Sequence, residues 1–138
     1  MASSNVFELE IVVPEKVYCR KNIVSISVKT SEGVMTILAH HTSLIATLPI
    51  DHMTINENGH ILHYAIAGGT MHVDHDHNKV TLVLNAIESK DEIDLNRADK
   101  AKMNAQNKLK DPSLPRREQL KAEIKLKRAL NRISLLQK

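Results

Sequence analysis

KVTLVLNAIESKDEIDLNRADKAKMNAQNKL, residues 79–109, is the stretch that decides the fold, because the spacing of its apolar residues changes inside it. Before Glu88 the apolar residues form short runs such as residues 79–84, which are typical of strands. After Glu88 they recur every three or four positions, the spacing of an amphipathic helix, at Leu95, Ala98, Ala101, Ala105 and Leu109. We therefore predict a β-rich domain over residues 1–88 and a helical segment over residues 89–138.

The helical segment is predicted to be a hairpin of two antiparallel helices. Ser89 with Glu92 three residues later is a capping-box candidate for its start, and Asp91 is an alternative cap. Residues 111–115 break the helical pattern, and Pro115 suits the first position of a second helix. The apolar stripe expected on that second helix consists of Ala122, Leu126, Leu130, Ile133 and Leu136.

Upstream of Glu88, short apolar segments alternate with turn residues. The predicted strands are residues 7–13, 23–28, 35–38, 44–48, 53–55, 61–67, 70–73 and 79–84. Asn58-Gly59 suits a tight hairpin turn, because both residues tolerate positive φ. Gly68-Gly69 is either another hairpin turn or a bulge where two backbones approach closely. Repeated short strands of this kind predict an all-β sandwich or flattened barrel.

The charge of the chain is unevenly distributed. From Pro115 onward there are eight basic and two acidic residues, which gives +6, so the remainder of this +3 chain carries 3 minus 6, or −3. A partner of the last helix should therefore be acidic: a phosphate, a nucleic acid or a carboxylate-rich protein surface. The only aromatic residues are Phe7, Tyr18 and Tyr64, which disfavours a protein that stacks on single-stranded nucleic acid.

The remaining composition excludes several classes of protein. Cys19 is the only cysteine, so no intramolecular disulfide can form and a reducing compartment is expected. Residues 1–10 lack the apolar run of a signal peptide and the arginine-rich pattern of a transit peptide. No apolar stretch is long enough to span a bilayer, so we expect a soluble protein.

The densest cluster of possible metal ligands is His72 with residues 74–77, DHDH. These residue types suit a divalent transition metal, but a solvated polar turn is the better interpretation, because no second ligand set lies at a recognisable spacing. No nucleophile–base motif and no glycine-rich phosphate loop is present. We therefore predict neither catalytic residues nor a metal site, although a hydrolase using a metal at His75 remains a third hypothesis.

Four charged residues form a more informative set. Asp94 and Arg97 share one face of the first predicted helix, and Arg128 and Arg132 share a face of the second. Two guanidinium groups on one face repel each other unless an anion lies between them, such as a triphosphate or a partner's carboxylates. The alternative is a solvated charged face. Because the first helix is rich in alanine, the hairpin is weakly held and could occupy two docked states.

The same residues carry a resemblance to the epsilon subunit of bacterial F-type ATP synthases. In the helical half, the resembling segments are Glu88, residues 93–98 (IDLNRA) and residues 128–132 (RALNR). In the first half they are residues 31–33 (SEG), residues 37–38 (IL), His41, Leu44, residues 64–69 (YAIAGG), Val73 and residues 78–81 (NKVT). The resemblance covers nearly the whole chain in order and spacing.

The resemblance implies a flattened β-sandwich of about ten strands followed by an antiparallel two-helix hairpin. It implies a non-catalytic subunit of the rotating central stalk, whose sandwich docks on the gamma subunit and the c-ring. It also implies a hairpin that reaches the alpha/beta catalytic head and inhibits ATP hydrolysis. The implied location is peripheral, on the cytoplasmic face of the bacterial cell membrane, with no nucleic-acid partner. The runner-up interpretation is a nucleic-acid-binding or adaptor protein that uses the basic helix.

The resemblance also implies specific residues. No cofactor is required, but ATP is implied as a regulatory ligand of the folded hairpin, at Glu88, Ile93, Asp94, Arg97, Ala98, Arg128 and Arg132. The loop residues implied to contact partners are Glu32, Gly33 and His41. Departures from the family pattern lie at Val34, Thr36, residues 39–40 and Asn104. At the position of Asn104, some ATP-binding members carry a basic residue.

Overall fold

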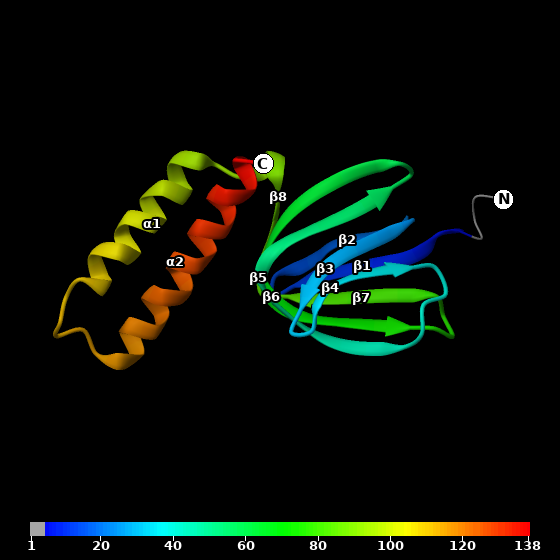
Figure 1. Cartoon of the computed structure of the whole chain (residues 1–138), viewed down its shortest axis with the longest axis horizontal. Coiled ribbons are helices and arrows are strands. Elements are labelled where there is room, and N and C mark those ends of the chain that lie inside the picture. Colours follow the sequence, from blue (N-terminus) through cyan, green and yellow to red (C-terminus); the bar gives the residue numbers. More distant parts are fainter. Residues whose placement is uncertain (1–4) are drawn as a thin grey trace. The chain divides into compact units, whose positions relative to one another are not determined.

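The computed structural model describes residues 5–138. The first four residues of the predicted β-domain therefore lie outside the described residues. The same four residues begin the segment 1–10 that was predicted to contain no signal or transit peptide. The chain divides into two compact units, the first ending at Ser89 and the second spanning Lys90–Lys138. The first unit is built from strands and the second from helices (Figure 1).

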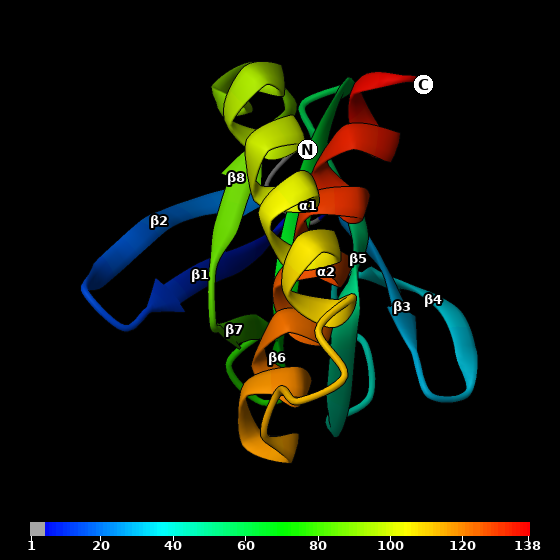
Figure 2. The ribbon, with the colours of Figure 1, turned by 90° about the vertical axis from the view of Figure 1, so that its left-hand side faces the viewer.

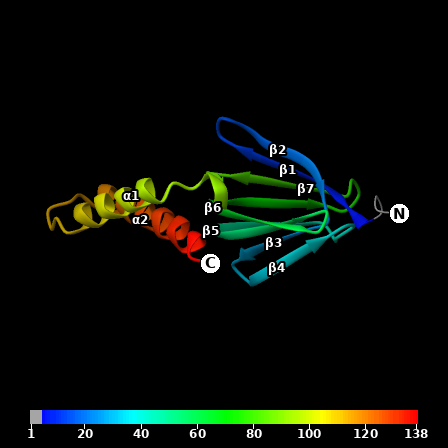
Figure 3. The same ribbon diagram turned by 90° about the horizontal axis from the view of Figure 1, so that it is seen from above.

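Eight strands make up the described part of the first unit, residues 5–89. They are β1 (Phe7–Val13), β2 (Lys16–Ile23), β3 (Ser25–Thr30), β4 (Gly33–Leu38), β5 (Leu44–Glu57), β6 (His60–Asp74), β7 (Lys79–Leu84) and β8 (Ile87–Ser89). Their hydrogen-bonded order is β2-β1-β7-β6-β5-β3-β4 (Figure 3). β8 also pairs with β6. The β1–β2 and β3–β4 hairpins therefore lie at opposite edges of the sheet, as Figure 2 shows.

Strands β5 and β6 each serve both layers of the sandwich. β6 pairs with β8 through Tyr64–Ile66 and then with β7 through Gly69–Asp74. β5 pairs with β3 only over its second half, Met53–Asn56. The bent β5–β6 ribbon thus connects a β2-β1-β7 layer to a β4-β3 layer, and the predicted sandwich is confirmed. The resemblance implied about ten strands, and the described residues form eight. Of the eight segments predicted from the sequence, two pairs are each one continuous strand, β5 and β6, while β8 and most of β2 were not predicted.

The Gly68-Gly69 pair lies at the bend of β6 and not in a hairpin turn. Here β6 leaves β8 and joins β7: the Ala67 N–H donates to the Ala86 carbonyl at 3.0 Å, and the Asn85 N–H donates to the Gly68 carbonyl at 2.9 Å. A Cβ at Gly69 would lie 2.1 Å from the Val83 carbonyl oxygen, so only glycine allows this approach of the two backbones. The second of the two open interpretations, close backbone approach, is therefore correct.

The hairpin turn predicted at Asn58-Gly59 is confirmed. Glu57 and His60 are paired, so the two residues between them form the whole turn, with φ of 54° and 88°. Most of strand β2 was not predicted: the predicted strand over residues 23–28 includes only its last residue, Ile23. The other residues of β2 are mostly polar and exposed, as is common in an edge strand, so they show no apolar pattern.

The core of the first unit is almost entirely aliphatic. Alternate residues of β1 are buried and their neighbours are half-buried, as the period-2 pattern predicted. Both layers contribute to one buried cluster, which includes Leu9, Ile11, Ile26, Val28, Ile37, Leu48, Ile55, Leu82 and Leu84. Full burial of one such side chain contributes about 1.5–3 kcal/mol, so these aliphatic residues stabilise the sandwich together with the two buried aromatic residues, Phe7 and Tyr64.

The second unit contains a short 3-10 helix, η2 (Lys90–Glu92), and two α-helices, α1 (Leu95–Leu109) and α2 (Arg116–Leu136). The predicted caps are wrong. The chain remains in β8 up to Ser89, and the N-cap of α1 is Asp94, whose Oδ1 accepts a hydrogen bond from the Arg97 N–H at 3.2 Å. Pro115 is the N-cap of α2 and not its first residue.

The two helices pack side by side (Figures 1 and 3), and buried alanines form the seam between them. Ala98 and Ala105 of α1 are buried, as are Ala122 and Ala129 of α2, so both helices present a small residue at intervals of seven. Residues without bulky side chains let two helix backbones approach closely. The predicted apolar stripes are partly wrong, since Leu95 and Leu130 are 48% and 46% exposed. Leu130 follows the seam residue Ala129 directly and so points about 100° away from it.

Candidate anion-binding groove and partner loops

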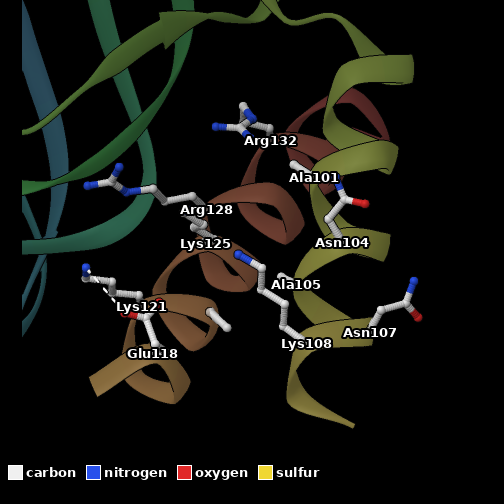
Figure 4. Close-up of a pocket in the computed structure, with 11 residues that line it drawn as sticks. Ala101, Asn104, Ala105, Asn107, Lys108, Glu118, Lys121, Lys125, Arg128 and Arg132 are labelled. Atoms are coloured by element: carbon white, nitrogen blue, oxygen red, sulfur yellow. Dashed lines mark ion pairs between the residues drawn. The ribbon is translucent and has the colours of Figure 1, made fainter. Parts of the chain in front are cut away.

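A groove of about 590 Å³ runs between α1 and α2, entirely within the second unit. Ala105 forms part of its lining (Figure 4), as does Ala122. The α1 side also contributes Ala101, Asn104, Asn107 and Lys108, and the α2 side contributes Glu118, Lys121, Lys125, Arg128 and Arg132. The groove exists because small side chains at the seam leave room between longer polar side chains at its margin.

The α2 side of the groove carries a regular row of charges. Residues 118, 121, 125, 128 and 132 are separated by three and four positions in turn, so they lie along one face of the helix. We call Lys121, Lys125, Arg128 and Arg132 the α2 cation stripe. With Lys108 from α1 the groove has five cations and one carboxylate, which gives 5 minus 1, or +4. Such a groove favours an anion.

Arg128 gives a second sign of an anion site. Its Nε atom is buried and has no hydrogen-bond partner in residues 5–138. A buried donor without a partner costs about 1–3 kcal/mol, and a charged donor costs more. A phosphate or carboxylate oxygen would satisfy that donor with a charge-assisted hydrogen bond.

Glu118 is the one carboxylate among the residues that line the groove in the described part of the chain. Glu118 lies at the end of the row, where its Oε1 is 3.8 Å from the Lys121 Nζ. Both side chains of this ion pair are about half exposed, so the pair contributes little to stability. The pair instead affects the local charge, because Glu118 offsets the charge of Lys121. The other cations that line the groove are Lys108, Lys125, Arg128 and Arg132.

Of the residues predicted to bind ATP, the structure brings Arg128 and Arg132 together in this groove. Arg97 is exposed and lies one turn before Ala101 on the same stripe of α1, but it does not line the groove. Ala98 is 1% exposed because it belongs to the helix seam.

The other three predicted ligand residues have different surroundings. Asp94 is the N-cap of α1, and its Oδ1 accepts the Arg97 backbone N–H. Ile93 is half-buried just before that cap. Glu88 lies in β8 of the first unit, where it pairs with Ala65. The sequence predicted that Asp94 and Arg97 share a face of the first helix; in the structure Asp94 is the N-cap, and its side chain fixes the start of α1.

Five further residues line the groove that were not predicted from the sequence: Lys108, Lys121 and Lys125, and the amides Asn104 and Asn107. For the α2 residues a signal existed, because the spacing of three and four from Glu118 to Arg132 is visible in the sequence. For Lys108 no sequence signal could have served, since its place depends on how α1 packs against α2.

The residues predicted to contact partners do not form one patch. Glu32 and Gly33 lie in the exposed β3–β4 turn, where the Thr30 Oγ1 donates to the Gly33 carbonyl at 2.9 Å and accepts the Glu32 N–H at 3.2 Å. His41 lies beyond the other end of β4, half-buried in the β4–β5 loop. Six residues of extended strand, roughly 20 Å, separate the two ends of β4. Any partner that contacts both must therefore span this length.

The histidine-rich loop is held by hydrogen bonds to a neighbouring loop. The His75 N–H donates to the Ser43 Oγ at 2.8 Å, and the His75 Nδ1 donates to the His40 carbonyl at 3.0 Å. The His77 ring, 2.6 Å from Asp74, holds the pKa of that carboxyl below its usual range. Among residues 5–138 no three histidine, cysteine, aspartate or glutamate side chains are placed to hold a metal ion.

Two further features bear on chemistry and on location. Burial raises the pKa of the Cys19 thiol, which keeps it from the reactive thiolate form at neutral pH. Neither α1 nor α2, the two α-helices of the described chain, has the length and apolar character to cross a bilayer.

Two family profiles match this chain. Residues 6–90 match the beta-sandwich domain of the ATP synthase delta/epsilon chain, and residues 91–137 match its long alpha-helix domain. The chain is 36% identical to the ATP synthase epsilon chain of Caldicellulosiruptor bescii over 129 residues, which is 94% of this chain and 92% of the relative. It is 37% identical to the epsilon chain of Ruminococcus albus over 133 residues, or 96% and 98% of the two chains.

Solved structures show the same fold. A chain of the Euglena gracilis mitochondrial ATP synthase complex of OSCP, F1 and c-ring superposes with a TM-score of 0.80 at 23% identity, covering 96% of this chain and 82% of that one. A chain of the Tetrahymena thermophila mitochondrial ATP synthase central stalk and c-ring has a TM-score of 0.60 at 13% identity, covering 94% and 96%. The chain belongs to the ATP synthase delta/epsilon family, among the bacterial epsilon chains.

Proposed function

We propose that the chain is a non-catalytic rotor subunit of an F-type ATP synthase, which links the gamma subunit to the c-ring and restrains ATP hydrolysis through its helical hairpin. Its relatives are ATP synthase epsilon chains along nearly their full length. The similar solved chains come from complexes that contain F1, a central stalk or a c-ring. A subunit of this kind would sit peripherally on the cytoplasmic face of the cell membrane, bound through the complex.

The observation that carries the regulatory part is the +4 groove with the unpartnered Arg128 Nε. We propose that the triphosphate of ATP occupies this groove as a regulatory ligand and not as a substrate. Arg128 and Arg132, one turn apart, would each donate hydrogen bonds to phosphate oxygens. Asp94 and Arg97 would act at the start of α1, where the Asp94 cap fixes the backbone of Arg97.

The same cations explain how the hairpin could change partners. An alanine seam buries little area, so the folded hairpin is held weakly. A ligand at 100 times its dissociation constant stabilises the state it binds by about 2.7 kcal/mol, which is enough to bias such an equilibrium. Without ATP, the α2 cation stripe would be available to an acidic surface of the alpha/beta catalytic head.

The test is isothermal titration of the isolated chain with ATP, together with an assay for released phosphate. We expect binding without turnover. Arg132→Ala and Arg128→Ala should each weaken binding by about tenfold, the effect of losing one charge-assisted hydrogen bond of ~1.4 kcal/mol. Arg117→Ala is the matched control, because Arg117 is exposed on α2 and outside the groove. Equal effects of all three variants would exclude the groove as the nucleotide site.

The rotor role needs a separate test, because it does not depend on ATP. Tagged chain should retain the gamma subunit and c-ring in a pull-down from detergent-solubilised complex. Glu32→Lys, in the exposed β3–β4 turn, should reduce this retention more than Glu15→Lys, in the exposed β1–β2 turn. Failure to retain either subunit would contradict the rotor role. Binding to a DNA duplex that weakens steeply with salt would favour the nucleic-acid alternative instead.

A further inference from the structure

We infer that the edge strand β4 pairs with β4 of a second copy of this chain, so that two sandwiches share one antiparallel sheet across a two-fold axis at Thr36. The inference assigns an interaction surface, Gly33–Leu38, and its occupant. It does not rest on the proposed function, because it concerns the isolated chain and involves no residue of the helical groove.

Three strands of the described sandwich, β2, β4 and β8, pair with a single neighbour. Such a strand exposes unpaired N–H and C=O groups, and proteins commonly protect it with charged residues, an irregular register or a short length. β2 carries three cations, Lys16, Arg20 and Lys21. Its register with β1 also shifts between Ile11 and Val12. β8 is only three residues long, so both of these strands are protected.

β4 has none of these protections. Its sequence, GVMTIL, contains no charged residue and no proline, and its register with β3 is unbroken over six pairs. Every second residue of β4 directs its backbone N–H and C=O groups away from β3. Val34 and Leu38 are 77% and 57% exposed, so apolar side chains accompany these groups. β4, the outer strand of its hairpin, is therefore an edge at which a further strand can pair (Figure 3).

The sequence of β4 is complementary to itself in antiparallel pairing. With Thr36 opposite its own copy, Val34 lies opposite Leu38. In the same register Met35 lies opposite Ile37. Every pair is then apolar or threonine–threonine, and such cross-strand pairs are stabilising. A two-fold interface brings each residue near the axis against its own copy, so an uncharged strand avoids like-charge repulsion there.

The residues beyond the two ends of β4 are also complementary. The register brings the turn before β4, with the exposed Glu32, toward the loop after β4 of the other copy, with the exposed His40. An imidazole N–H can donate a hydrogen bond to a carboxylate. The two-fold axis produces this contact twice. The ends of β4 therefore favour a second copy of this chain over an unrelated strand.

The small size of the contact sets its strength. Six paired residues extend over roughly 20 Å. One pair of strands of this length buries less than the ~800 Å² per partner of a standard interface. We therefore expect a dimer that forms at chain concentrations of roughly 100 µM and above. Because pairing uses the free β4 edge of both copies, the assembly stops at two.

Sedimentation equilibrium of the full chain over a range of concentrations tests the inference. We expect a reversible equilibrium between monomer and dimer, with no larger species. Thr36→Lys places two lysines against each other at the axis and should abolish the dimer. Val17→Lys is the matched control, because Val17 is 49% exposed on the other edge strand, β2. It should change the dissociation constant by less than about twofold.

An exchange of charges tests the register. Val34→Lys and Leu38→Glu should each weaken the dimer about tenfold, since a charge then faces an apolar side chain at two symmetry-related places. The double variant pairs the new lysine of one copy with the new glutamate of the other. It should restore the affinity to within about threefold of the original value. Restoration cannot result from misfolding, and urea denaturation followed by tyrosine fluorescence checks that each variant remains folded.

Each other outcome overturns the inference. A chain that stays monomeric at millimolar concentration has no self-pairing edge. Aggregates that grow beyond two copies contradict a contact closed by a two-fold axis. A dimer that survives Thr36→Lys is formed by another surface, and a double variant as weak as the single variants contradicts the register about Thr36. None of these results bears on the rotor role, which the pull-down tests separately.

Discussion

Substitution of Gly69 by alanine should unfold the sandwich far more readily than the size of a methyl group suggests. Gly69 is paired with Leu84 of β7, and its φ is 155°. The added Cβ would lie 2.1 Å from the Val83 carbonyl oxygen and 2.8 Å from the Leu84 Cα. Ordinary Cβ contacts begin near 3.4 Å, so β6 and β7 would have to separate by 3.4 minus 2.1, or 1.3 Å.

The cost has two parts. Overpacking of a closely packed site costs about 1–3 kcal/mol, and a non-glycine residue at positive φ costs a further ~1–2 kcal/mol. We therefore expect Gly69→Ala to lower the free energy of unfolding by at least about 3 kcal/mol. Gly59→Ala is the matched control, because Gly59 has φ of 88° but nothing within 4 Å of its added Cβ. It should cost only ~1 kcal/mol.

Urea denaturation followed by tyrosine fluorescence measures this difference. Tyr18 and Tyr64 are the only tyrosines, no tryptophan is present, and both tyrosines lie in the first unit, so the signal reports the sandwich alone. With a slope of about 2 kcal/mol per molar urea, the midpoint should fall by ~1.5 M for Gly69→Ala and by ~0.5 M for Gly59→Ala. If the urea midpoints of Gly69→Ala and Gly59→Ala agree within error, the close approach of β6 and β7 is not the reason that position 69 requires glycine.

Three further outcomes are expected. Ala105→Leu, at a position 2% exposed in the helix seam, should destabilise the hairpin by about 1–3 kcal/mol in thermal unfolding followed at 222 nm; a matching loss in exposed Gln106→Leu would show that the seam is not the cause. Asp94→Ala should lower the stability of α1 by ~1 kcal/mol, whereas Asp94→Asn should retain most of it, since asparagine also caps helices; equal losses would contradict a capping role. The Glu10 carboxylate accepts a hydrogen bond from Arg20 at 2.6 Å and lies 3.2 Å from the Lys79 Nζ, which lowers its pKa. Because the Glu10 pKa is lower in the folded state, the stability that Glu10 contributes is present above the ordinary carboxyl pKa and is lost as the pH falls through the folded value. Arg20→Ala should raise the Glu10 pKa in an NMR titration. An unchanged pKa would contradict Arg20 as the cause of the lowered value.

Much of the fold follows from local sequence patterns. The alternation in β1, the Asn58-Gly59 turn and the change of period after Glu88 were each sufficient to predict the local structure that is observed. These features depend on residues adjacent in the chain, so the physics that produces them is readable from the sequence.

Other features were predicted incorrectly because they depend on contacts between distant residues. Ser89 fits a helix cap by its neighbours alone, but pairing of β8 with Tyr64 of β6 keeps it in a strand, and Asp94 caps α1 instead. Leu130 fits an apolar stripe, but the alanine seam leaves it 46% exposed. In each case tertiary packing overrode a correct local preference.

The candidate site likewise has a part that the sequence predicts and a part that only tertiary structure defines. The sequence by itself determined that Arg128 and Arg132 share one helix face and that positive charge is concentrated in the last helix, because spacing and charge are properties of a single segment. Only the tertiary structure decided that Lys108 joins them across a groove, that Arg97 stays outside its lining, and that Glu32 and His41 lie at opposite ends of β4. Those outcomes depend on which side chains meet between two helices, or at which end of a strand a loop emerges, and no pattern within one segment specifies that.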